Sequence, residues 1–179
     1  MTDTALLKRL KIEPLDRNIH DRAAFSCGEQ RIDNFLKTNA AGQQDQGVTK
    51  AYVIVEPPEK RVLGFYAMNA HSIDATVIPE DLRKKLPKYP TFGAIYISMI
   101  GTHTDLQGRG MGSYLLADSL RRCIDVADKT GVLAVMLDAL NDDAARLYRR
   151  IGFIDIPSEQ HHRRMMISMQ AVRKAYGAA

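Results

Sequence analysis

The chain has 179 residues, of which 45% are hydrophobic and 26% are charged, and its net charge is +4. These values are those of an ordinary soluble globular protein, and the length favours one domain, which we place at residues 1–179. No apolar run is long enough to span a membrane, and the N-terminal residues lack the apolar region and cleavage site of a signal peptide. Cys27 and Cys123 show neither metal spacing nor a catalytic grouping, so we expect two reduced thiols in a cytoplasmic protein.

The first half of the chain predicts one long helix and a strand hairpin. Ser26 is a suitable N-cap residue, and Glu29 three positions later completes a capping box. Apolar residues follow at helical spacing from Ile32 to Ala40. Two runs rich in β-branched and aromatic residues then flank a proline-rich turn, which is typical of a hairpin. In chain order, the predicted elements are a strand at 10–15, a helix from 26 to the polar stretch at 43–47, strands at 49–56 and 61–72 joined by a turn at 57–60, and a short helix at 79–86.

The second half of the chain predicts alternating strands and helices. A nearly all-apolar run at 132–137 indicates a strand buried on both faces. Asn141 can cap the helix after that strand, and Gly131 and Gly152 are placed to end helices. Strands first and β-α-β-α-β afterwards predict a mixed α/β (α+β) fold. The predicted elements are a strand at 95–102, a helix at 113–129, a strand at 132–137, a helix at 141–150 and a last strand at 165–169.

Three glycines alternate at Gly108, Gly110 and Gly112, between a predicted strand and a predicted helix. A glycine-rich turn that opens a helix leaves backbone N–H groups unpaired at the positive end of the helix dipole, an arrangement that binds phosphate. The spacing matches neither a dinucleotide fingerprint, whose third glycine comes one residue later, nor a P-loop, which needs a lysine before Ser113. The pattern that remains is Q-x-x-G-x-G, beginning at Gln107.

A second pattern, N-x-x-A-x-x-L-Y, runs from Asn141 to Tyr148. Ala144 and Leu147 are expected on the packed face of this helix. Tyr148 follows one turn after Ala144, so its side chain is expected near the ends of the strands. Taken alone, Tyr148 is best interpreted as a half-buried packing residue, although a tyrosine hydroxyl can also donate a proton to a leaving group.

Together the two patterns resemble the GNAT superfamily of acyl-CoA N-acyltransferases, over residues 10–170. The resemblance implies a mixed, mostly antiparallel sheet, flanked by helices and splayed between strands 4 and 5, with acetyl-CoA as cosubstrate and no metal. It implies that the amides of the glycine turn bind pyrophosphate, that the main chain near Ile100 pairs with pantetheine, and that Tyr148 protonates the departing CoA thiolate. The implied cofactor-binding residues are Ile100, Thr102, Gln107, Gly108, Arg109, Gly110, Met111, Gly112, Ser113, Asn141 and Ala144.

An upstream segment narrows the resemblance. Residues 25–36, FSCGEQRIDNFL, resemble the F-x-C-G-x-x-x-L-D-x-[FW]-L opening of the TacT-like toxin acetyltransferases. Residues 62–67 and 83–87 resemble the V-x-G-F-Y-x strand and the basic segment of the same toxins. This resemblance implies a toxin that acetylates the α-amine of aminoacyl-tRNA and blocks translation. It also implies a homodimer, a ribbon-helix-helix antitoxin, and binding to operator DNA only through that antitoxin.

Basic residues gather in two places. Residues 144–179 contain seven basic residues, and a second group precedes the central strand at residues 83–88. A solvated face is the simplest interpretation of such runs, and a surface for a polyanion such as RNA is the functional one. The toxin resemblance favours contact with tRNA phosphates.

The residues before the glycine turn depart from the R-L-A-V-D of the family, because residues 99–103 are MIGTH. Gly101 allows a bulge or a local opening of the strand. His103 is a candidate base for the incoming amine and equally a polar residue at a strand end, and Glu29 and Asp33 are further candidates. A base is not required, because the α-amine of an aminoacyl ester loses its proton near neutral pH.

Two other functions are compatible with the motifs. One is an ordinary GNAT enzyme that acetylates a small-molecule amine or a protein N-terminus. The other is a protein that binds CoA or RNA without catalysis. A metal enzyme is not expected, because His161 and His162 have no third ligand at a useful spacing.

Overall fold

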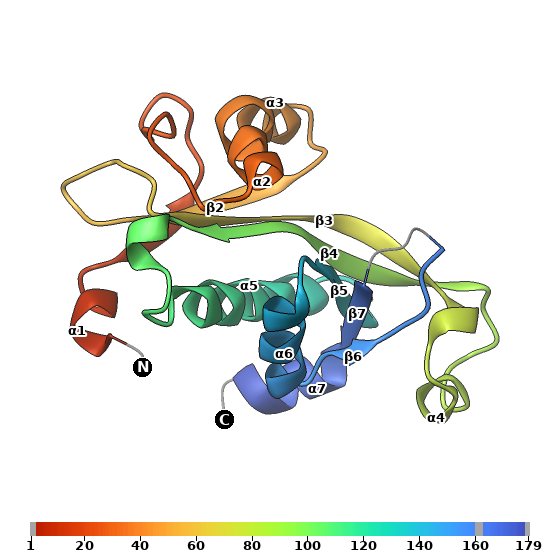
Figure 1. Ribbon diagram of the computed structural model, residues 1–179. Coiled ribbons are helices and arrows are strands. Elements are labelled where there is room, and N and C mark those ends of the chain that lie inside the picture. The colour runs from red at the N-terminus through yellow and green to blue at the C-terminus, as the bar shows by residue number, and fades with distance from the viewer. Residues whose placement is uncertain (1–2, 160–162, 178–179) are drawn as a thin grey trace. The chain divides into compact units, whose positions relative to one another are not determined.

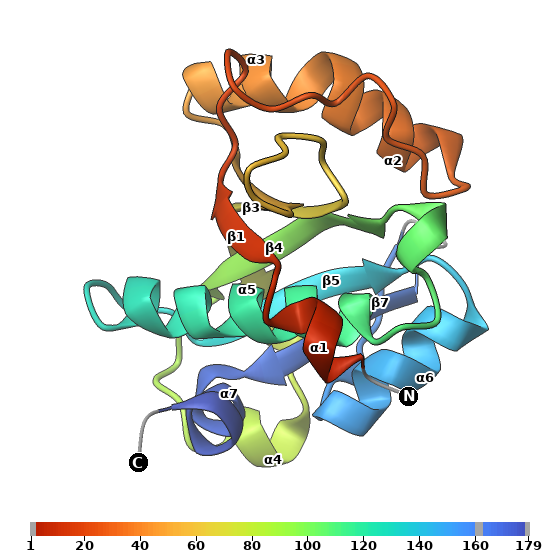
Figure 2. The ribbon, with the colours of Figure 1, turned by 90° about the vertical axis from the view of Figure 1, so that its left-hand side faces the viewer.

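The computed structural model describes residues 3–159 and 163–177 (Figures 1 and 2). The chain divides into two compact units: unit 1 is Met1–Asn69 with Ser98–Asp118, and unit 2 is Ala70–Ile97 with Ser119–Ala179. In chain order, the elements are α1 (Thr4–Leu7), β1 (Lys11–Pro14), α2 (Gln30–Asn34), a π-helical segment η1 (Phe35–Asn39), α3 (Ala40–Asp45), β2 (Lys50–Val55), β3 (Gly64–Asp74), η2 (Ala75–Val77), α4 (Glu80–Arg83), β4 (Thr91–Thr102), η3 (Thr104–Leu106), α5 (Met111–Ala127), β5 (Ala134–Ala139), α6 (Asp142–Ile151), β6 (Ile154–Asp155), β7 (Arg163–Ser168) and α7 (Met169–Tyr176).

The strands of the described residues are hydrogen-bonded in the order β1-β2-β3-β4-β5-β7-β6. The pairs β1–β2, β2–β3, β5–β7 and β6–β7 are antiparallel, whereas β4 and β5 are parallel. The predicted fold class, a mixed and mostly antiparallel α/β sheet with helices beside it, is therefore confirmed. No helix in the described part of the chain is long and apolar enough to cross a membrane.

Unit 1 packs a helical segment against a hairpin. The pieces α2, η1 and α3 follow one another along a single helical path (Figure 2) and lie on the side of β2 and β3 shown uppermost in Figure 1. Their apolar side chains meet the inward side chains of the hairpin in one core cluster, with Phe25 and Phe35 against Phe65 at ring distances of 5.5 and 6.1 Å. The predicted hairpin is confirmed by the antiparallel register of Ala51 with Ala67.

The start of the helical segment differs from the prediction. The helix begins at Gln30 rather than after Ser26, and Glu29, its N-cap residue, makes no side-chain capping bond. Asp33, in the first turn, instead accepts the backbone N–H of Cys27 at 2.8 Å and the hydroxyl of Ser26 at 3.3 Å. The predicted capping box is wrong because a first-turn carboxylate binds the preceding donors itself, so the chain before Glu29 stays non-helical.

Gly101, on β4, is required by close packing within unit 1. A Cβ built at this position would lie 2.9 Å from Ile32 Cγ2 and 3.4 Å from the Phe65 ring. From the sequence we expected Gly101 to allow a bulge or an opening of the strand. The structure instead shows that a larger side chain would collide with Ile32 and Phe65.

We expect Gly101→Ala to destabilise the protein by about 1–3 kcal/mol, because the added methyl overpacks a filled core. Gly42→Ala is the matched control, because a Cβ at Gly42 in α3 meets nothing within 4 Å. That variant should gain roughly 0.5–1 kcal/mol from helix propensity. Urea unfolding midpoints measure both effects, and a Gly101→Ala protein as stable as the wild type would contradict the packing argument.

Unit 2 is built around β5. Ala134, Val135, Met136 and Leu137 are all at most 3% exposed, which confirms the prediction of a buried strand, although the strand begins two residues later than predicted and ends at Ala139. β5 pairs with β4 from Ala134 to Leu137 and with β7 along its whole length. On one face, side chains of these strands pack with apolar residues from η2 and α4 in a second core cluster.

The C-terminal helix α7 was not predicted. It begins at Met169, directly after β7, and Ser168 caps it by accepting the N–H of Ala171 at 3.2 Å. The sequence contains this capping signal, but no turn residue separates the strand from the helix, so the prediction ended with a strand at 165–169. The short elements α1 and β6 were also missed.

Candidate functional site

The glycine turn lies in unit 1 between η3 and α5, as predicted. Gly108 and Gly110 have φ angles of 74° and 85°, in the left-handed region that glycine adopts without strain. α5 begins at Met111, and the N–H of Tyr114 bonds to the carbonyl of Gly110 at 3.1 Å. The N–H groups of residues 111–113 therefore precede the first bond of the helix and stand at the positive end of its dipole. This geometry can bind a phosphate group.

The two long side chains of the turn hold it in place. The Gln107 amide donates to the carbonyls of Cys27 and Thr102 at 2.7 and 3.1 Å, which ties the turn to the end of β4. The Arg109 guanidinium contacts the Asp3 carboxylate at 2.5 Å, and this hydrogen bond lowers the pKa of Asp3. Met111 is 1% exposed, so its side chain is packed in the core and is not available to a ligand. The turn therefore offers main-chain donors rather than side chains.

His103 follows β4 and is buried. Its Nε2 lies 2.9 Å from a guanidinium nitrogen of Arg61, and its Nδ1 lies 3.2 Å from the N–H of Asp105, which it caps at the start of η3. The same Nε2 lies 3.2 Å from the carbonyl oxygen of Ala24, so protein groups contact both ring nitrogens. These contacts favour the structural interpretation of His103 over the catalytic one. Ile100 and Thr102, two residues apart on β4, are both half-buried.

The second predicted group of site residues lies in unit 2. Asn141 caps α6, since its side-chain oxygen accepts the N–H of Ala144 at 2.9 Å. The amide nitrogen of the same side chain remains a donor at an exposed position. The packed face of α6 is formed by Ala145 and Tyr148 rather than by Ala144 and Leu147, which are half-buried, so that detail of the prediction was one residue out of register.

The Tyr148 ring is buried and the residue is only 5% exposed. Its ring lies 5.9 Å from that of Phe153, and burial raises the pKa of its hydroxyl to about 12. Within the described residues, the Tyr148 hydroxyl has no hydrogen-bond partner. Every side-chain oxygen that is fully buried in this part of the chain does have a partner, so the Tyr148 hydroxyl is not fully buried. The hydroxyl oxygen therefore reaches an accessible surface, and it carries its proton at neutral pH. An accessible and protonated hydroxyl can donate a proton to a leaving group.

The basic residues near the C-terminus are largely neutralised by acids. Five of the seven basic residues at 144–179 form ion pairs, mostly with aspartates that precede this segment in the sequence. The pairs are Arg146 with Asp143, Arg149 with Asp155, Arg163 with Asp142, Arg164 with Asp138, and Arg173 with Asp128.

Several exposed cations of unit 2 provide free positive charge. Arg83, Lys85, Lys88 and Arg150 make no ion pair within the described residues, and the same holds for Lys129 and Lys174 elsewhere in this unit. The first four are the ones considered as a candidate surface. Three of them lie in or directly after α4, whereas Arg150 lies on α6. The candidate polyanion surface is therefore smaller than the charge count at 144–179 predicted.

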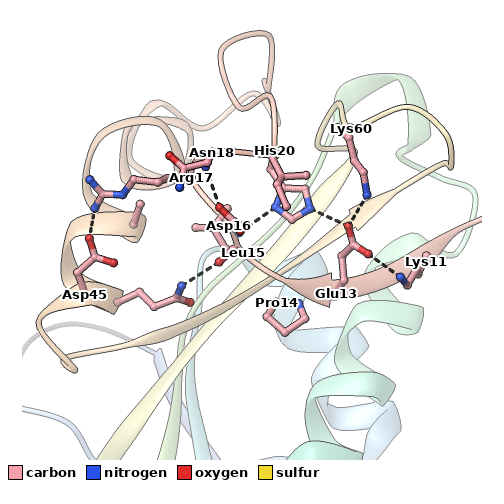
Figure 3. Close-up of a pocket in the computed structure, with 13 residues that line it drawn as sticks. Lys11, Glu13, Pro14, Leu15, Asp16, Arg17, Asn18, His20, Asp45 and Lys60 are labelled. Atoms are coloured by element: carbon pink, nitrogen blue, oxygen red, sulfur yellow. Dashed lines mark hydrogen bonds and ion pairs between the residues drawn. The ribbon is translucent and has the colours of Figure 1, made fainter.

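A hollow of about 780 Å³ in unit 1 contains none of the predicted site residues (Figure 3). Glu13 lies between Lys11, Lys60 and His20, and hydrogen bonds from these three groups lower its pKa to about 2. His20 Nδ1 accepts the N–H of Asp16 at 2.9 Å, so we assign its proton to Nε2, which lies 2.8 Å from Glu13. The charged groups at the centre of this hollow satisfy one another, and none is free to act on a substrate.

No group of three His, Cys, Asp or Glu side chains in the described part of the chain could hold a metal ion. His161 and His162, for which the sequence offers no third metal ligand, lie outside the described residues. Cys27 and Cys123 are both free thiols, and burial raises their pKa values to about 11 and about 12. Thiols with raised pKa values are poor nucleophiles.

The chain is similar to known acetyltransferases in both sequence and structure. Residues 47–155 match the model of the acetyltransferase (GNAT) domain family. The chain is 39% identical over 184 residues to "Probable toxin TacT" of Sinorhizobium fredii, with 99% of this chain and 100% of the relative covered. It is 32% identical over 157 residues to a tRNA-acetylating toxin of Mycobacterium tuberculosis, with 88% and 91% covered. Among solved structures, AtaT complexed with acetyl-methionyl-tRNAfMet matches with a TM-score of 0.85 and 25% identity, covering 92% of this chain and 98% of AtaT.

Proposed function

Because the chain belongs to the GNAT family of acetyltransferases, and is therefore an enzyme that uses acetyl-CoA, we propose that it is a toxin that acetylates the α-amine of aminoacyl-tRNA and blocks translation. The observation that carries this proposal is the 32% identity, over 88% of the chain, with a tRNA-acetylating toxin. The similarity to AtaT, which was solved with acetyl-methionyl-tRNAfMet, supports the same class of acceptor.

The turn residues supply the phosphate contacts in this proposal. The N–H groups from Gly108 to Ser113 bind the pyrophosphate of acetyl-CoA, with Gln107 as a brace behind them. The backbone groups of Ile100 and Thr102 pair with the two amides of the pantetheine arm as an added strand would. Because all these contacts are main-chain, the MIGTH departure at residues 99–103 leaves them intact.

The α6 residues supply the remaining cofactor contacts and the acid. The free amide N–H groups of Asn141 donate to pantetheine, and Ala144, being small, leaves room for the arm. The neutral amine attacks the acetyl carbonyl carbon, the C–S bond breaks, and the Tyr148 hydroxyl donates its proton to the leaving sulfur. The amine gives its extra proton to water, and the tyrosine is reprotonated from solvent. A general base is not part of this sequence.

The wider biology of the proposal rests on the toxin branch to which the chain is similar. We assign residues 1–179 to one acetyltransferase domain acting in the cytoplasm, because the GNAT model matches residues of both units. A homodimer, a ribbon-helix-helix antitoxin and operator binding through that antitoxin complete the proposal. Analytical ultracentrifugation tests the homodimer. Co-expression with any ribbon-helix-helix protein that a neighbouring gene encodes tests the antitoxin.

Arg83, Lys85, Lys88 and Arg150 are the proposed tRNA contacts. We expect the quadruple reversal of Arg83, Lys85, Lys88 and Arg150 to glutamate to raise the KM for charged tRNA at least tenfold. The salt slope of binding should fall by about one for each phosphate that the variant no longer binds. As a matched control, Lys129→Glu and Lys174→Glu alter exposed lysines elsewhere in unit 2. If KM rises equally in the Lys129/Lys174 control, the effect comes from the net charge of the protein and not from the four cations at Arg83, Lys85, Lys88 and Arg150.

The acceptor is tested directly with purified protein, radiolabelled acetyl-CoA and aminoacyl-tRNA. The proposal predicts labelled N-acetyl-aminoacyl-tRNA and arrest of a translation extract. Transfer to small amines or peptide N-termini without tRNA would identify an ordinary GNAT enzyme. Acetyl-CoA binding by calorimetry without transfer to any amine would identify a non-catalytic binding protein. Either of the last two results overturns the toxin proposal.

A further inference from the structure

Four polar side chains of unit 2 form a row across neighbouring strands. They are His71 on β3, Tyr96 on β4, Asp138 on β5 and Arg164 on β7. Each is two positions from a residue of the second core cluster on its own strand, so all four lie on the same face of the sheet as that core. We call this group the polar row. It continues the face covered by η2 and α4, but its members are exposed or half-buried.

The polar row is held in one arrangement by Asp138. The Tyr96 hydroxyl donates to Asp138 at 2.8 Å, and Arg164 donates to the same carboxylate through two nitrogens at 2.8 and 3.1 Å. The guanidinium lies over the Tyr96 ring, 5.4 Å from its centre, and the His71 ring lies 5.4 Å from that ring on the neighbouring strand. A bidentate carboxylate pair fixes the plane of the guanidinium. The rings and the cation are thus ordered before any ligand binds.

Part of this ordered group remains open to solvent. His71 is exposed, and the side chains of Arg164 and Asp138 are 23% and 20% exposed. Asp138 uses two of the five N–H donors of Arg164. The surface therefore presents aromatic rings beside a planar cation with donors to spare. Unpaired RNA bases are bound in this way, by stacking on aromatic rings and guanidinium planes, with the remaining donors on ribose or phosphate oxygens.

We propose that the polar row binds the terminal nucleotide at the unpaired 3′ end of the aminoacyl-tRNA acceptor. In this proposal the base stacks on the exposed ring of His71, which Tyr96 supports from the neighbouring strand, and Arg164 donates to the sugar-phosphate oxygens. This inference rests on the proposed function, because the amino acid to be acetylated is esterified to that nucleotide. Asp138 acts through its neighbours and is a positioning residue. The contact is sequence-tolerant, since it uses the face of the base rather than its hydrogen-bonding edge.

The test compares uncharged tRNA with the same tRNA lacking its 3′-terminal adenosine, using the complete chain. We expect the wild type to bind the trimmed tRNA roughly tenfold more weakly, as the loss of one stacked base predicts. His71→Ala should bind full-length tRNA more weakly and lose most of this discrimination. Ser72→Ala, one residue along β3 and therefore on the opposite face, is the matched control and should discriminate as the wild type does.

Kinetics provide the second readout. His71→Ala should raise the KM for aminoacyl-tRNA several-fold and leave acetyl-CoA affinity unchanged. The variant is expected to fold, because the only ring contact of this exposed side chain within the described residues is with Tyr96. The inference is overturned if His71→Ala still prefers full-length over trimmed tRNA as strongly as the wild type does. It is also overturned if the wild type binds both tRNAs equally well, even where acetyl transfer to tRNA is observed. Absence of transfer by the wild type overturns the proposed function instead.

Discussion

Tyr148→Phe is expected to lower kcat for acetyl transfer by roughly 10²- to 10⁴-fold, the usual contribution of a positioned general acid. The affinity for acetyl-CoA should change little, because the ring and its contact with Phe153 remain. Stability should also be nearly unchanged, since the hydroxyl has no partner in the described residues whose removal would leave a polar group unsatisfied. Single-turnover kinetics and calorimetry separate the two parameters.

Tyr176→Phe is the matched control for that variant. Tyr176 lies on α7, and its ring, which Arg121 contacts at 5.9 Å, is retained in phenylalanine. The control should keep wild-type kcat. Equal activity of Tyr148→Phe and the wild type would remove Tyr148 from the mechanism and leave it as a packing residue.

The raised pKa of Tyr148 also determines how activity depends on pH. With a pKa of about 12, the hydroxyl stays protonated throughout the range in which the protein can be assayed. The α-amine of the acceptor must be neutral to attack, and α-amines ordinarily titrate near pH 8. The value of kcat/KM should therefore rise with pH to a plateau, without a falling limb before about pH 10. The same rising limb should remain in Tyr148→Phe at a lower plateau.

The features predicted correctly from the sequence are those that short-range physics determines. The Asn141 cap, the glycine turn that opens α5 and the apolar strand β5 each depend on a few consecutive residues. The capping box at Ser26 failed although it is also local, because Asp33 accepts the Ser26 hydroxyl and the N–H of Cys27. A sequence pattern does not rank two competing caps when both are sterically feasible.

The features that could not be predicted depend on residues far apart in the chain. Arg164 looked like free positive charge because Asp138, its partner across the sheet, is 26 positions away. Tyr96 showed no special signal, since its partners lie on strands whose register was unknown. Gly101 was attributed to backbone freedom because the approach of Ile32 is a tertiary contact. In each case the missing information was which side chains the fold brings within a few ångströms.

Gly110→Ala is expected to weaken acetyl-CoA binding by about ten- to a hundredfold, because a methyl group in the turn hinders close approach of the pyrophosphate to the amides. The hydrogen bonds between these amides and the pyrophosphate are charge-assisted, and removing one of them accounts for a change of this size. The φ of 85° at Gly110 also means that the alanine is strained by roughly 1–2 kcal/mol, which alone would lower stability. Strain and ligand binding must therefore be separated.

Gly47→Ala makes that separation. Gly47 also lies in unit 1, its φ of 73° imposes a similar strain, and a Cβ there meets nothing within 4 Å. Both variants should lose comparable stability in urea unfolding, but only Gly110→Ala should bind acetyl-CoA more weakly by calorimetry. Stabilisation of the folded protein by saturating acetyl-CoA should shrink in parallel, because ligand stabilisation depends on the ratio of ligand concentration to Kd. If both variants bind acetyl-CoA equally well, the glycine turn serves chain geometry alone and the pyrophosphate is bound elsewhere.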